Sequence, residues 1–353
     1  MSRNKILLEE ASKIKCRNIV AFEPENIFYM TGFWGEVIAL SNGSGMKLIA
    51  PKLEAERARK SSRNSKVIES ERGSDMLKSL LSNLSNGNVC TDCNEYSTIE
   101  KIREKIGNRL IHNVEPFYSA RKIKDNKEIE IIAKASRILD KLFAICENEI
   151  KPNVTERRLQ AALLYEAMNM GAYPPSYRFT LSPLIIASGM NSSLPHAEPT
   201  DRKIRKGDLV TVDLTLRYEG YIADATRTFA VGTIGSEQKK IYHIVKEAQE
   251  HGLDAVKAGA KCGAVDASCR SFIKKAGYGK YFIHSTGHGI GVEVHEPPWL
   301  RMKNDEILQK NMTVTVEPGI YLPNKFGVRI EDSVVVDKKV RVLNKYTKDL
   351  ISL

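Results

Sequence analysis

Four acidic residues stand out because they recur in two similar hairpin patterns. They are Asp213, Asp224, Glu317 and Glu331. In each pattern a run of alternating Val and Thr ends in one acid, a turn follows, and a second run carries the other acid. Residues placed symmetrically about a hairpin turn face each other on one side of the sheet. Each hairpin is therefore predicted to hold two carboxylates directly opposite each other, the first pair about Tyr218–Glu219 and the second about Asn324.

Such pairs require compensation, because like charges opposite each other destabilise a sheet. A shared proton or a bound cation can supply it. The four carboxylates carry four negative charges, which two divalent ions would balance. The pattern therefore suits a dinuclear metal site, with a shared proton as the alternative.

Three of the seven histidines lie close to these acids in the sequence. His284, His288 and His295 fall within one short glycine-rich stretch, where the backbone can approach a site closely. The stretch superficially resembles a phosphate-binding loop, but it lacks the spacing, the lysine and the following helix of such loops. We therefore expect these histidines to belong to the acidic site. His243 and His251 lie on a predicted helix and are assigned no role.

The two acidic patterns are separated by 104 residues, measured from Asp213 to Glu317. This spacing favours a duplicated architecture of two halves with a site between them. A chance resemblance of two Val/Thr strands is the alternative. Each half needs helices to cover its strands, and amphipathic or capped segments fit that role. We predict helices over residues 129–143, 155–170, 237–256 and 262–275.

The first part of the chain has a different organisation. Short strand-like runs at residues 18–22 and 46–50 alternate with helical runs at 53–60 and 76–84, which indicates a small α/β domain. A charged stretch follows it. We therefore predict an N-terminal domain over residues 1–118, a linker over 119–127 and a second domain over 128–353.

Composition limits the class of protein. The chain has 353 residues, a net charge of +11 and 42% hydrophobic residues, which is ordinary for a soluble globular protein. The positive charge is spread along the chain and no recognition motif accompanies it, so nucleic acid is not an expected partner. We also expect no membrane span and no signal peptide. The six cysteines are expected to be reduced thiols in a cytoplasm. Cys90 and Cys93 form a lone CxxC pair, interpreted as two ordinary cysteines, with a zinc or redox role as the alternative.

With these acids and histidines in this order, the sequence resembles the pita-bread metallopeptidases. This family includes prolidases, aminopeptidases P and, more distantly, methionine aminopeptidases. The resemblance covers about residues 120–350, and residues 1–118 resemble the creatinase-like domain that prolidases and aminopeptidases P carry. The motifs are Ile186-Ala-Ser-Gly-Met-Asn-Ser-Ser-Leu-Pro-His196, Val212-Asp-Leu214, Ala223-Asp-Ala-Thr-Arg-Thr-Phe229, Thr286-Gly-His-Gly-Ile-Gly291, His295-Glu-Pro-Pro298, Val316-Glu-Pro-Gly-Ile-Tyr321 and Gly327-Val-Arg-Ile-Glu-Asp332. The resemblance implies a creatinase-like α/β domain followed by a pita-bread domain with a curved antiparallel sheet and an internal pseudo-two-fold repeat.

The resemblance also implies a set of site residues. The family's five metal ligands fall on Asp213, Asp224, His288, Glu317 and Glu331, with Asp224 and Glu331 bridging two ions. Manganese or cobalt is expected first, with zinc or iron as alternatives, because all accept oxygen ligands with one imidazole. The resemblance further implies catalytic roles for Glu317, which would carry a proton to the leaving nitrogen, and for His196, His284 and His295, which would orient the substrate. Strand alternation places Arg329 on the face of Glu331, where it is expected to hold the acidic ligands in place, with a solvated strand arginine as the alternative.

The implied function is metal-dependent hydrolysis of the peptide bond before proline, in a homodimer that acts on small peptides. An Xaa-Pro dipeptidase is preferred over an aminopeptidase P, and a non-catalytic peptide-binding relative is a remote alternative. A dipeptidase must recognise the free carboxylate of proline, which calls for a cation past the proline. In archaeal-type prolidases an arginine is expected four residues after the second motif histidine. That position is Trp299 here, and Arg301 could replace it.

Overall fold

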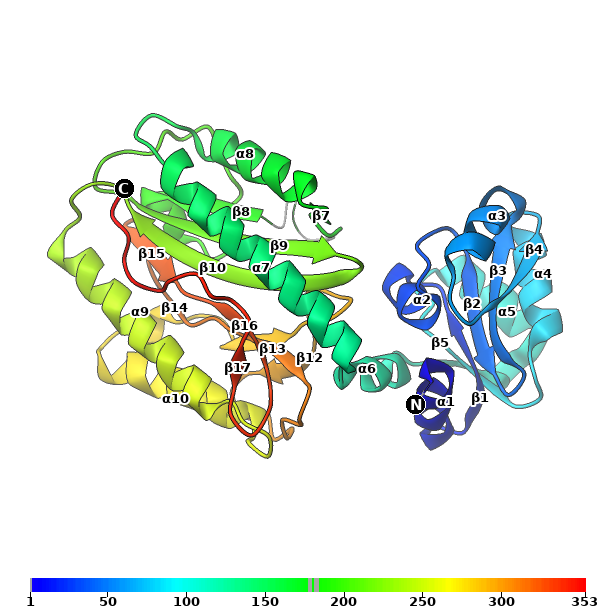
Figure 1. Cartoon of the computed structure of the whole chain (residues 1–353). Coiled ribbons are helices and arrows are strands. Elements are labelled where there is room, and N and C mark those ends of the chain that lie inside the picture. Colours follow the sequence, from blue (N-terminus) through cyan, green and yellow to red (C-terminus); the bar gives the residue numbers. More distant parts are fainter. Residues whose placement is uncertain (1, 177–179, 181–183) are drawn as a thin grey trace. The chain divides into compact units, whose positions relative to one another are not determined.

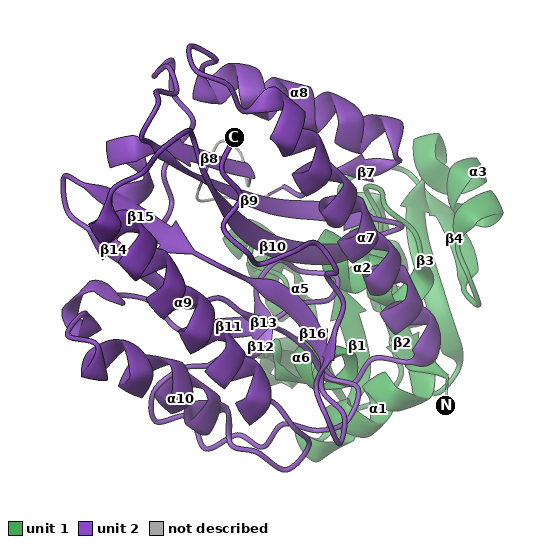
Figure 2. Cartoon of the chain, turned by 60° about the vertical axis from the view of Figure 1, so that its left-hand side comes forward, with its two compact units in different colours: residues 1–121 green, residues 122–353 purple. Residues whose placement is uncertain are grey.

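The chain forms two compact units, residues 1–121 and 122–353 (Figure 2). The computed structural model describes residues 2–176, 180 and 184–353. The division falls within the stretch predicted as a linker, but most of that stretch is helical. Helix α6 (Glu115–Lys122) runs into it, and α7 (Asn126–Glu149) begins within it. Asp125 starts α7 early, because its side chain accepts from the Glu128 N–H (2.8 Å) while the Glu128 side chain accepts from the Asp125 N–H (2.7 Å).

The first unit is built on a six-stranded mixed sheet in the order β4-β3-β2-β1-β5-β6. Its strands are β1 (Cys16–Ala21), β2 (Ile38–Asn42), β3 (Gly45–Pro51), β4 (Lys66–Ser70), β5 (Asn88–Thr91) and β6 (Leu110–His112). Its remaining helices are α1 (Arg3–Lys13), α2 (Pro24–Thr31), α3 (Lys52–Ser61), α4 (Ser74–Asn83) and α5 (Tyr96–Ile106). The predicted α/β character and its two strands and two helices are confirmed.

The CxxC pair of the first unit consists of two buried free thiols. The Cys90 thiol donates to the Asn113 carbonyl oxygen (3.0 Å), and burial raises the pKa of both thiols. These contacts are those of ordinary buried cysteines, as interpreted from the sequence.

The second unit contains four long helices, shown in Figure 1 from green to yellow. They are α7, α8 (Glu156–Asn169), α9 (Ser236–Ala255) and α10 (Cys262–Lys275). All four predicted helices are confirmed, and Thr155 caps α8 by accepting from the Arg158 N–H (3.1 Å). Within the described residues, no helix has both the length and the apolar character needed to cross a membrane.

The strands of the second unit pair only in antiparallel fashion in the ladders that the structure describes. They are β7 (Ala172–Tyr173), β8 (Leu184–Ser188), β9 (Leu209–Tyr218), β10 (Tyr221–Ala230), β11 (Gly287–Gly289), β12 (Glu296–Leu300), β13 (Thr313–Val316), β14 (Gly319–Leu322), β15 (Phe326–Arg329), β16 (Asp332–Val335) and β17 (Arg341–Val342). β9 joins β7, β8 and β10, β12-β11-β13-β16-β17 form a second sheet, and β14 pairs with β15.

Two hydrophobic clusters divide this unit into halves. One packs α7 and α8 against β8, β9 and β10, and the other packs α9 and α10 against strands β12 to β16. Each half thus consists of two helices followed by a hairpin with two acids. The halves meet where β10 lies against β15 and β16, and there the Glu331 N–H donates to the Thr226 carbonyl (3.1 Å). The pita-bread architecture and its internal repeat are confirmed.

The first acidic hairpin turns one residue later than predicted. Glu219 and Gly220 both have positive φ, 46° and 88°, as a two-residue turn between twisted strands requires. Asp213 is therefore opposite Thr226, and Asp224 is opposite Thr215. The predicted direct pairing of Asp213 with Asp224 is wrong, because the register is shifted by two. A shift of two keeps both carboxylates on the same face, as diagonal neighbours.

The second acidic hairpin has the predicted register. Val316 is opposite Asp332, and Gly319 is opposite Arg329. Both pairs are symmetric about Asn324, which has a φ of 60° in the turn. This register places Glu317 and Glu331 across from each other in the interval between the two ladders. Both acids therefore emerge where regular pairing stops, next to β10.

Candidate active site

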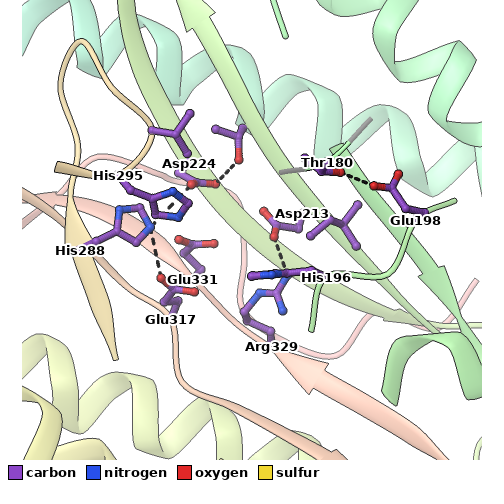
Figure 3. A pocket seen from close by; sticks show the side chains of 13 residues that line it. Thr180, His196, Glu198, Asp213, Asp224, His288, His295, Glu317, Arg329 and Glu331 are labelled. Carbon is purple, nitrogen blue, oxygen red and sulfur yellow. Dashed lines mark hydrogen bonds and ion pairs between the residues drawn. The ribbon is translucent and has the colours of Figure 1, made fainter. Parts of the chain in front are cut away.

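A cavity of about 270 Å³ opens above the two hairpins (Figure 3). Its size is near the lower end of the usual range for small-molecule sites, which suits a short peptide. Eight of the nine predicted site residues line it: His196, Asp213, Asp224, His288, His295, Glu317, Arg329 and Glu331. They come from both halves of the second unit, so the fold brings together residues more than 130 positions apart.

The centre of the site is a buried cluster of Asp224, His288 and Glu331. One possible ligand atom from each residue lies within 4.8 Å of the other two. Threonine hydroxyls orient the two carboxylates: Thr215 donates to Asp224 Oδ1 (2.9 Å), and Thr226 donates to Glu331 Oε2 (2.7 Å). In each carboxylate one oxygen is thus held by a threonine.

His288 presents one ring nitrogen to this cluster. Its Nδ1 lies 3.1 Å from the Gly289 carbonyl oxygen, which can only accept, so Nδ1 carries the proton. Its Nε2 lies 3.3 Å from Glu317 Oε1 and 4.0 Å from Asp224 Oδ2. A fixed tautomer with Nε2 facing carboxylates is an arrangement typical of metal-ligating histidines.

Asp213 occupies the other side of the site and is bound by Arg329. The guanidinium Nη2 of Arg329 donates to Asp213 Oδ2 (2.5 Å), and both side chains are buried. Asp213 Oδ1 is buried and, among the described residues, has no hydrogen-bond partner. A buried carboxylate oxygen without a partner is costly, and a bound cation would satisfy it.

The electrostatics of the site also favour a bound cation. Burial first, and then the neighbouring carboxylates, raise the pKa of both Asp224 and Glu331 well above the usual range. Burial would also raise the pKa of Glu317, but its hydrogen bond with His288 lowers it to about 2. If all four carboxylates were ionised, their charge of −4 would exceed the charge of +2 that Arg329 and a protonated His288 supply.

These residues fit divalent metal ions. The donor set is four carboxylates and one imidazole, and it includes the unpartnered oxygen of Asp213. Bound cations would hold Asp224 and Glu331 in the ionised state that burial opposes. A single shared proton would leave Asp213 Oδ1 without a partner, so the cation alternative fits the structure better.

His196 and His295 both line the cavity, and Figure 3 shows His295 beside His288. The ring of His295 meets the ring of His288 edge-on, with 4.3 Å between centroids, and stacks with Trp299 at 6.4 Å. Burial first, and then His288, lower the pKa of His295 to about 3. Trp299, whose ring is stacked with that of His295, is not among the residues that line the cavity.

His284 is the predicted site residue that does not line the cavity. Its Nδ1 donates to the Ser285 carbonyl (2.7 Å), and its Nε2 accepts from the Tyr321 hydroxyl (2.9 Å). Tyr321 in turn accepts from Arg329 Nη1 (2.7 Å). A direct contact between His284 and a substrate is therefore not supported, and its effect passes through Tyr321 and Arg329 to Asp213.

Five further residues line the cavity without having been predicted. They are Thr180, Ile185, Glu198, Thr215 and Val294. Thr215 could have been found from the hairpin, because it lies on the face of Asp213, two residues along the strand. Glu198 follows His196 by two residues, and its carboxylate accepts from the Thr180 hydroxyl. Nothing in the local sequence distinguishes Ile185 or Val294 from core residues.

Comparison with protein families agrees with this geometry. Residues 130–338 match the model of metallopeptidase family M24, and residues 3–123 match the creatinase/prolidase N-terminal domain. The two matches correspond closely to the two compact units.

Individual relatives cover nearly the whole chain. The Xaa-Pro dipeptidase of Pyrococcus furiosus is 36% identical over 333 residues, which is 93% of each chain. Two solved structures are also similar: an Xaa-Pro dipeptidase from Bacillus anthracis (33% identity, TM-score 0.91, 99% of each chain) and an X-Pro aminopeptidase from Thermotoga maritima (32% identity, TM-score 0.89, 100% of each chain). The buried acidic cluster, the repeated hairpins and these matches lead to one conclusion: the chain belongs to metallopeptidase family M24 and is an Xaa-Pro peptidase with a creatinase-type N-terminal domain.

Proposed function

We propose that this enzyme hydrolyses Xaa-Pro dipeptides with the help of two divalent metal ions. The observation that carries the proposal is the set of four carboxylates and one imidazole in the wall of a small cavity. Three relatives that are 33–36% identical to this chain carry the name Xaa-Pro dipeptidase, and this supports the choice of substrate.

The proposed ligands are Asp213, Asp224, His288, Glu317 and Glu331. When bound, the ions supply Lewis-acid polarisation and a lowered pKa for water. Manganese or cobalt remains the preferred metal, and zinc or iron the alternative. Arg329 holds Asp213 in place, and His284 is a positioning residue that acts on Arg329 through Tyr321.

The remaining steps belong to side chains in the cavity wall. Glu317 accepts the proton released by the attacking water and delivers it to the proline nitrogen as the peptide bond breaks. His196 and His295 donate hydrogen bonds to the substrate, where they orient it and stabilise negative charge on the carbonyl oxygen. The proline nitrogen must gain this proton to leave as a neutral amine, as any peptide nitrogen must.

An aminopeptidase P activity is the second candidate, and one observation favours it. Arg301 is exposed beyond the end of β12 and does not line the cavity, so its expected role as a carboxylate clamp is not supported. Within the described residues, Arg329 is the one arginine or lysine of the cavity wall, and it is bound to Asp213. Among the described residues, no arginine or lysine of the cavity wall is therefore available for the carboxylate of a dipeptide, and this favours a substrate that continues past proline.

Substrate length distinguishes the two activities. We expect Ala-Pro to be cleaved with a kcat/KM about tenfold or more above that of Ala-Pro amide and Ala-Pro-Ala, because a charge-assisted hydrogen bond to the free carboxylate contributes about 1.5–3 kcal/mol. The amide is the matched control, since it removes the charge at almost constant size. The Arg301→Ala variant should behave like the unmodified enzyme. Faster cleavage of Ala-Pro-Ala than of Ala-Pro would instead identify an aminopeptidase P.

The histidines are expected to separate into two classes. His288→Ala should lower bound metal as well as rate, because it removes a ligand. His196→Ala and His295→Ala should lower kcat/KM by about 100-fold or more while metal stays bound, as loss of a transition-state donor does. Metal analysis of the dialysed variants beside steady-state kinetics measures both effects. Equal loss of metal in all three variants would contradict these roles.

A further inference from the structure

Glu156 precedes all the proposed metal ligands by more than 50 positions in the sequence. Its buried carboxylate nevertheless accepts several hydrogen bonds. It is fully buried at the first position of α8. Five donors from three residues reach it: the N–H and hydroxyl of Ser188, the side-chain amide of Asn191, and the N–H and hydroxyl of Thr200. All five donors are neutral, and their distances run from 2.7 to 3.2 Å.

These donors bracket the segment that carries His196. Ser188 is the last residue of β8, and Thr200 follows twelve positions later, so one carboxylate ties both ends of segment 188–200 together. The start of α8 adds two backbone contacts, since the Glu156 N–H donates to the Arg202 carbonyl (3.2 Å) and the Arg157 N–H donates to the Thr200 carbonyl (3.1 Å). The negative charge at this helix N-terminus is also favoured by the helix dipole.

The middle of the same segment is held by hydrogen bonds from β15, the strand that carries Arg329. The Ser192 hydroxyl accepts from the Gly327 N–H (2.9 Å), and the Pro195 carbonyl accepts from Arg329 Nη1 (3.1 Å). A side chain at Gly327 would meet the Ser192 carbonyl oxygen at 2.1 Å, so the segment lies directly against β15. With its ends fixed by Glu156 and its centre by β15, the segment has little freedom to move His196.

We propose that Glu156 is a positioning residue that sets the place of the His196 imidazole in the cavity. The proposal rests on the role of His196 in the proposed function. A carboxylate suits the task because both oxygens only accept, and all five surrounding groups donate. Glutamine has nearly the same shape but turns an NH₂ group toward two or three donors, so it breaks the contacts at one end of the segment. Loss of Glu156 therefore acts on catalysis through His196.

A double-mutant cycle tests this coupling. As a single change, Glu156→Gln should lower kcat/KM for Ala-Pro by about tenfold or more. A tenfold fall corresponds to a loss of about 1.4 kcal/mol of transition-state stabilisation. In the His196→Ala background the same change should cost less than about twofold, with bound metal unchanged in all variants. A residue that merely stabilises the fold would lower kcat/KM by the same factor in both backgrounds, and that result would overturn the proposal.

Asp140→Asn is the matched control. The Asp140 carboxylate also accepts from two backbone groups, the N–H of Lys345 and that of Tyr346, but it does not line the cavity. This variant should unfold at a lower temperature and keep kcat/KM within about twofold in both backgrounds. If Glu156→Gln does not fold, Thr200→Val removes one hydroxyl contact and should show the same coupling with a smaller effect. Equal costs of Thr200→Val in both backgrounds would likewise overturn the proposal.

A measurement without turnover separates this proposal from the proposed function. In an NMR spectrum of protein labelled with isotopes at histidine, the signal of the His196 ring is identified as the one that disappears in His196→Ala. We expect it to shift in Glu156→Gln and to stay in place in Asp140→Asn. An unmoved signal would contradict the positioning role even in an active enzyme. Failure of the unmodified enzyme to release proline would contradict the proposed function and leave the signal shift to decide on Glu156.

Discussion

Removal of divalent metal is expected to abolish the release of proline, with a fall in rate of at least about 1,000-fold. The reason is the charge of the site: the buried carboxylates of Asp213, Asp224 and Glu331 share one cavity with the partly buried Glu317, and Arg329 and His288 contact Asp213 and Glu317 respectively. Without cations the protonated forms of Asp224 and Glu331 are favoured, because burial and their neighbours raise the pKa of both. Dialysis against a chelator, followed by an assay of proline release from Ala-Pro, measures the loss.

Restoration is the control for the chelation experiment. Addition of Mn²⁺ or Co²⁺ to the dialysed enzyme should recover most of the activity, whereas Mg²⁺ is expected to serve poorly because it prefers oxygen ligands alone. The thermal unfolding of the second unit should also shift upward with the added ion, since ligands that bind only the folded state stabilise it. Undiminished activity in metal-free protein would rule out the dinuclear mechanism.

The second large effect is expected from Asp224→Asn. This change keeps the shape of the side chain and the hydrogen bond from Thr215, but it removes one negative charge from between His288 and Glu331. Loss of a residue that only supports a metal ligand typically costs 10–100-fold. Loss of a shared ligand should cost more, so we expect kcat/KM for Ala-Pro to fall by about 1,000-fold and the bound metal to decrease.

Asp201→Asn is the matched control for this charge change. Asp201 is exposed and forms a surface ion pair with Arg157, so it removes one negative charge from the same unit without touching the cavity. Such pairs contribute little, and activity should stay within about twofold. An Asp224→Asn enzyme with more than a tenth of the normal activity and a full complement of metal would contradict the bridging role.

The acidic hairpins show how far sequence reasoning reaches. Alternation of side chains placed all four acids on the correct face, because the period of a strand is fixed at two. The pairing in the first hairpin was nevertheless wrong, since register depends on which residues adopt positive φ in the turn. Glu219 does so although it is neither glycine nor asparagine. In the second hairpin the turn contains Asn324, a residue that tolerates this conformation, and the register was correct.

Contacts between distant segments could not be read from the sequence. Strand alternation predicted that Arg329 holds acidic ligands but not that its partner is Asp213, which lies 116 positions away. Nothing in the sequence indicated that Glu156 binds a segment 32 to 44 positions along the chain. A second buried ion pair between distant residues joins Lys124 to Glu296 at 2.8 Å. Glu296 is the residue that directly follows His295 in the sequence. Charged residues of this type are usually exposed, so only the packed structure distinguishes them from surface residues.

The predicted linker over residues 119–127 contains the division between the two units, and most of it is helical. The run of charged residues indicated a linker but not its conformation, and charge does not prevent a helix when a cap is present. The capping box of Asp125 and Glu128 begins α7 within this run, and α6 extends into it from the other side. The same charged run also supplies Lys124, whose ammonium is buried in the second unit.

The central claim is that two divalent ions held by the four carboxylates and His288 are required for proline release. Stepwise addition of Mn²⁺ to metal-free enzyme, with bound metal and Ala-Pro hydrolysis measured on the same samples, tests it most directly. We expect activity to reach its plateau at two ions per chain in the unmodified enzyme and to stay near zero at every ratio in Asp224→Asn. A plateau already reached in the absence of added metal, or a fully active Asp224→Asn enzyme, would contradict the claim.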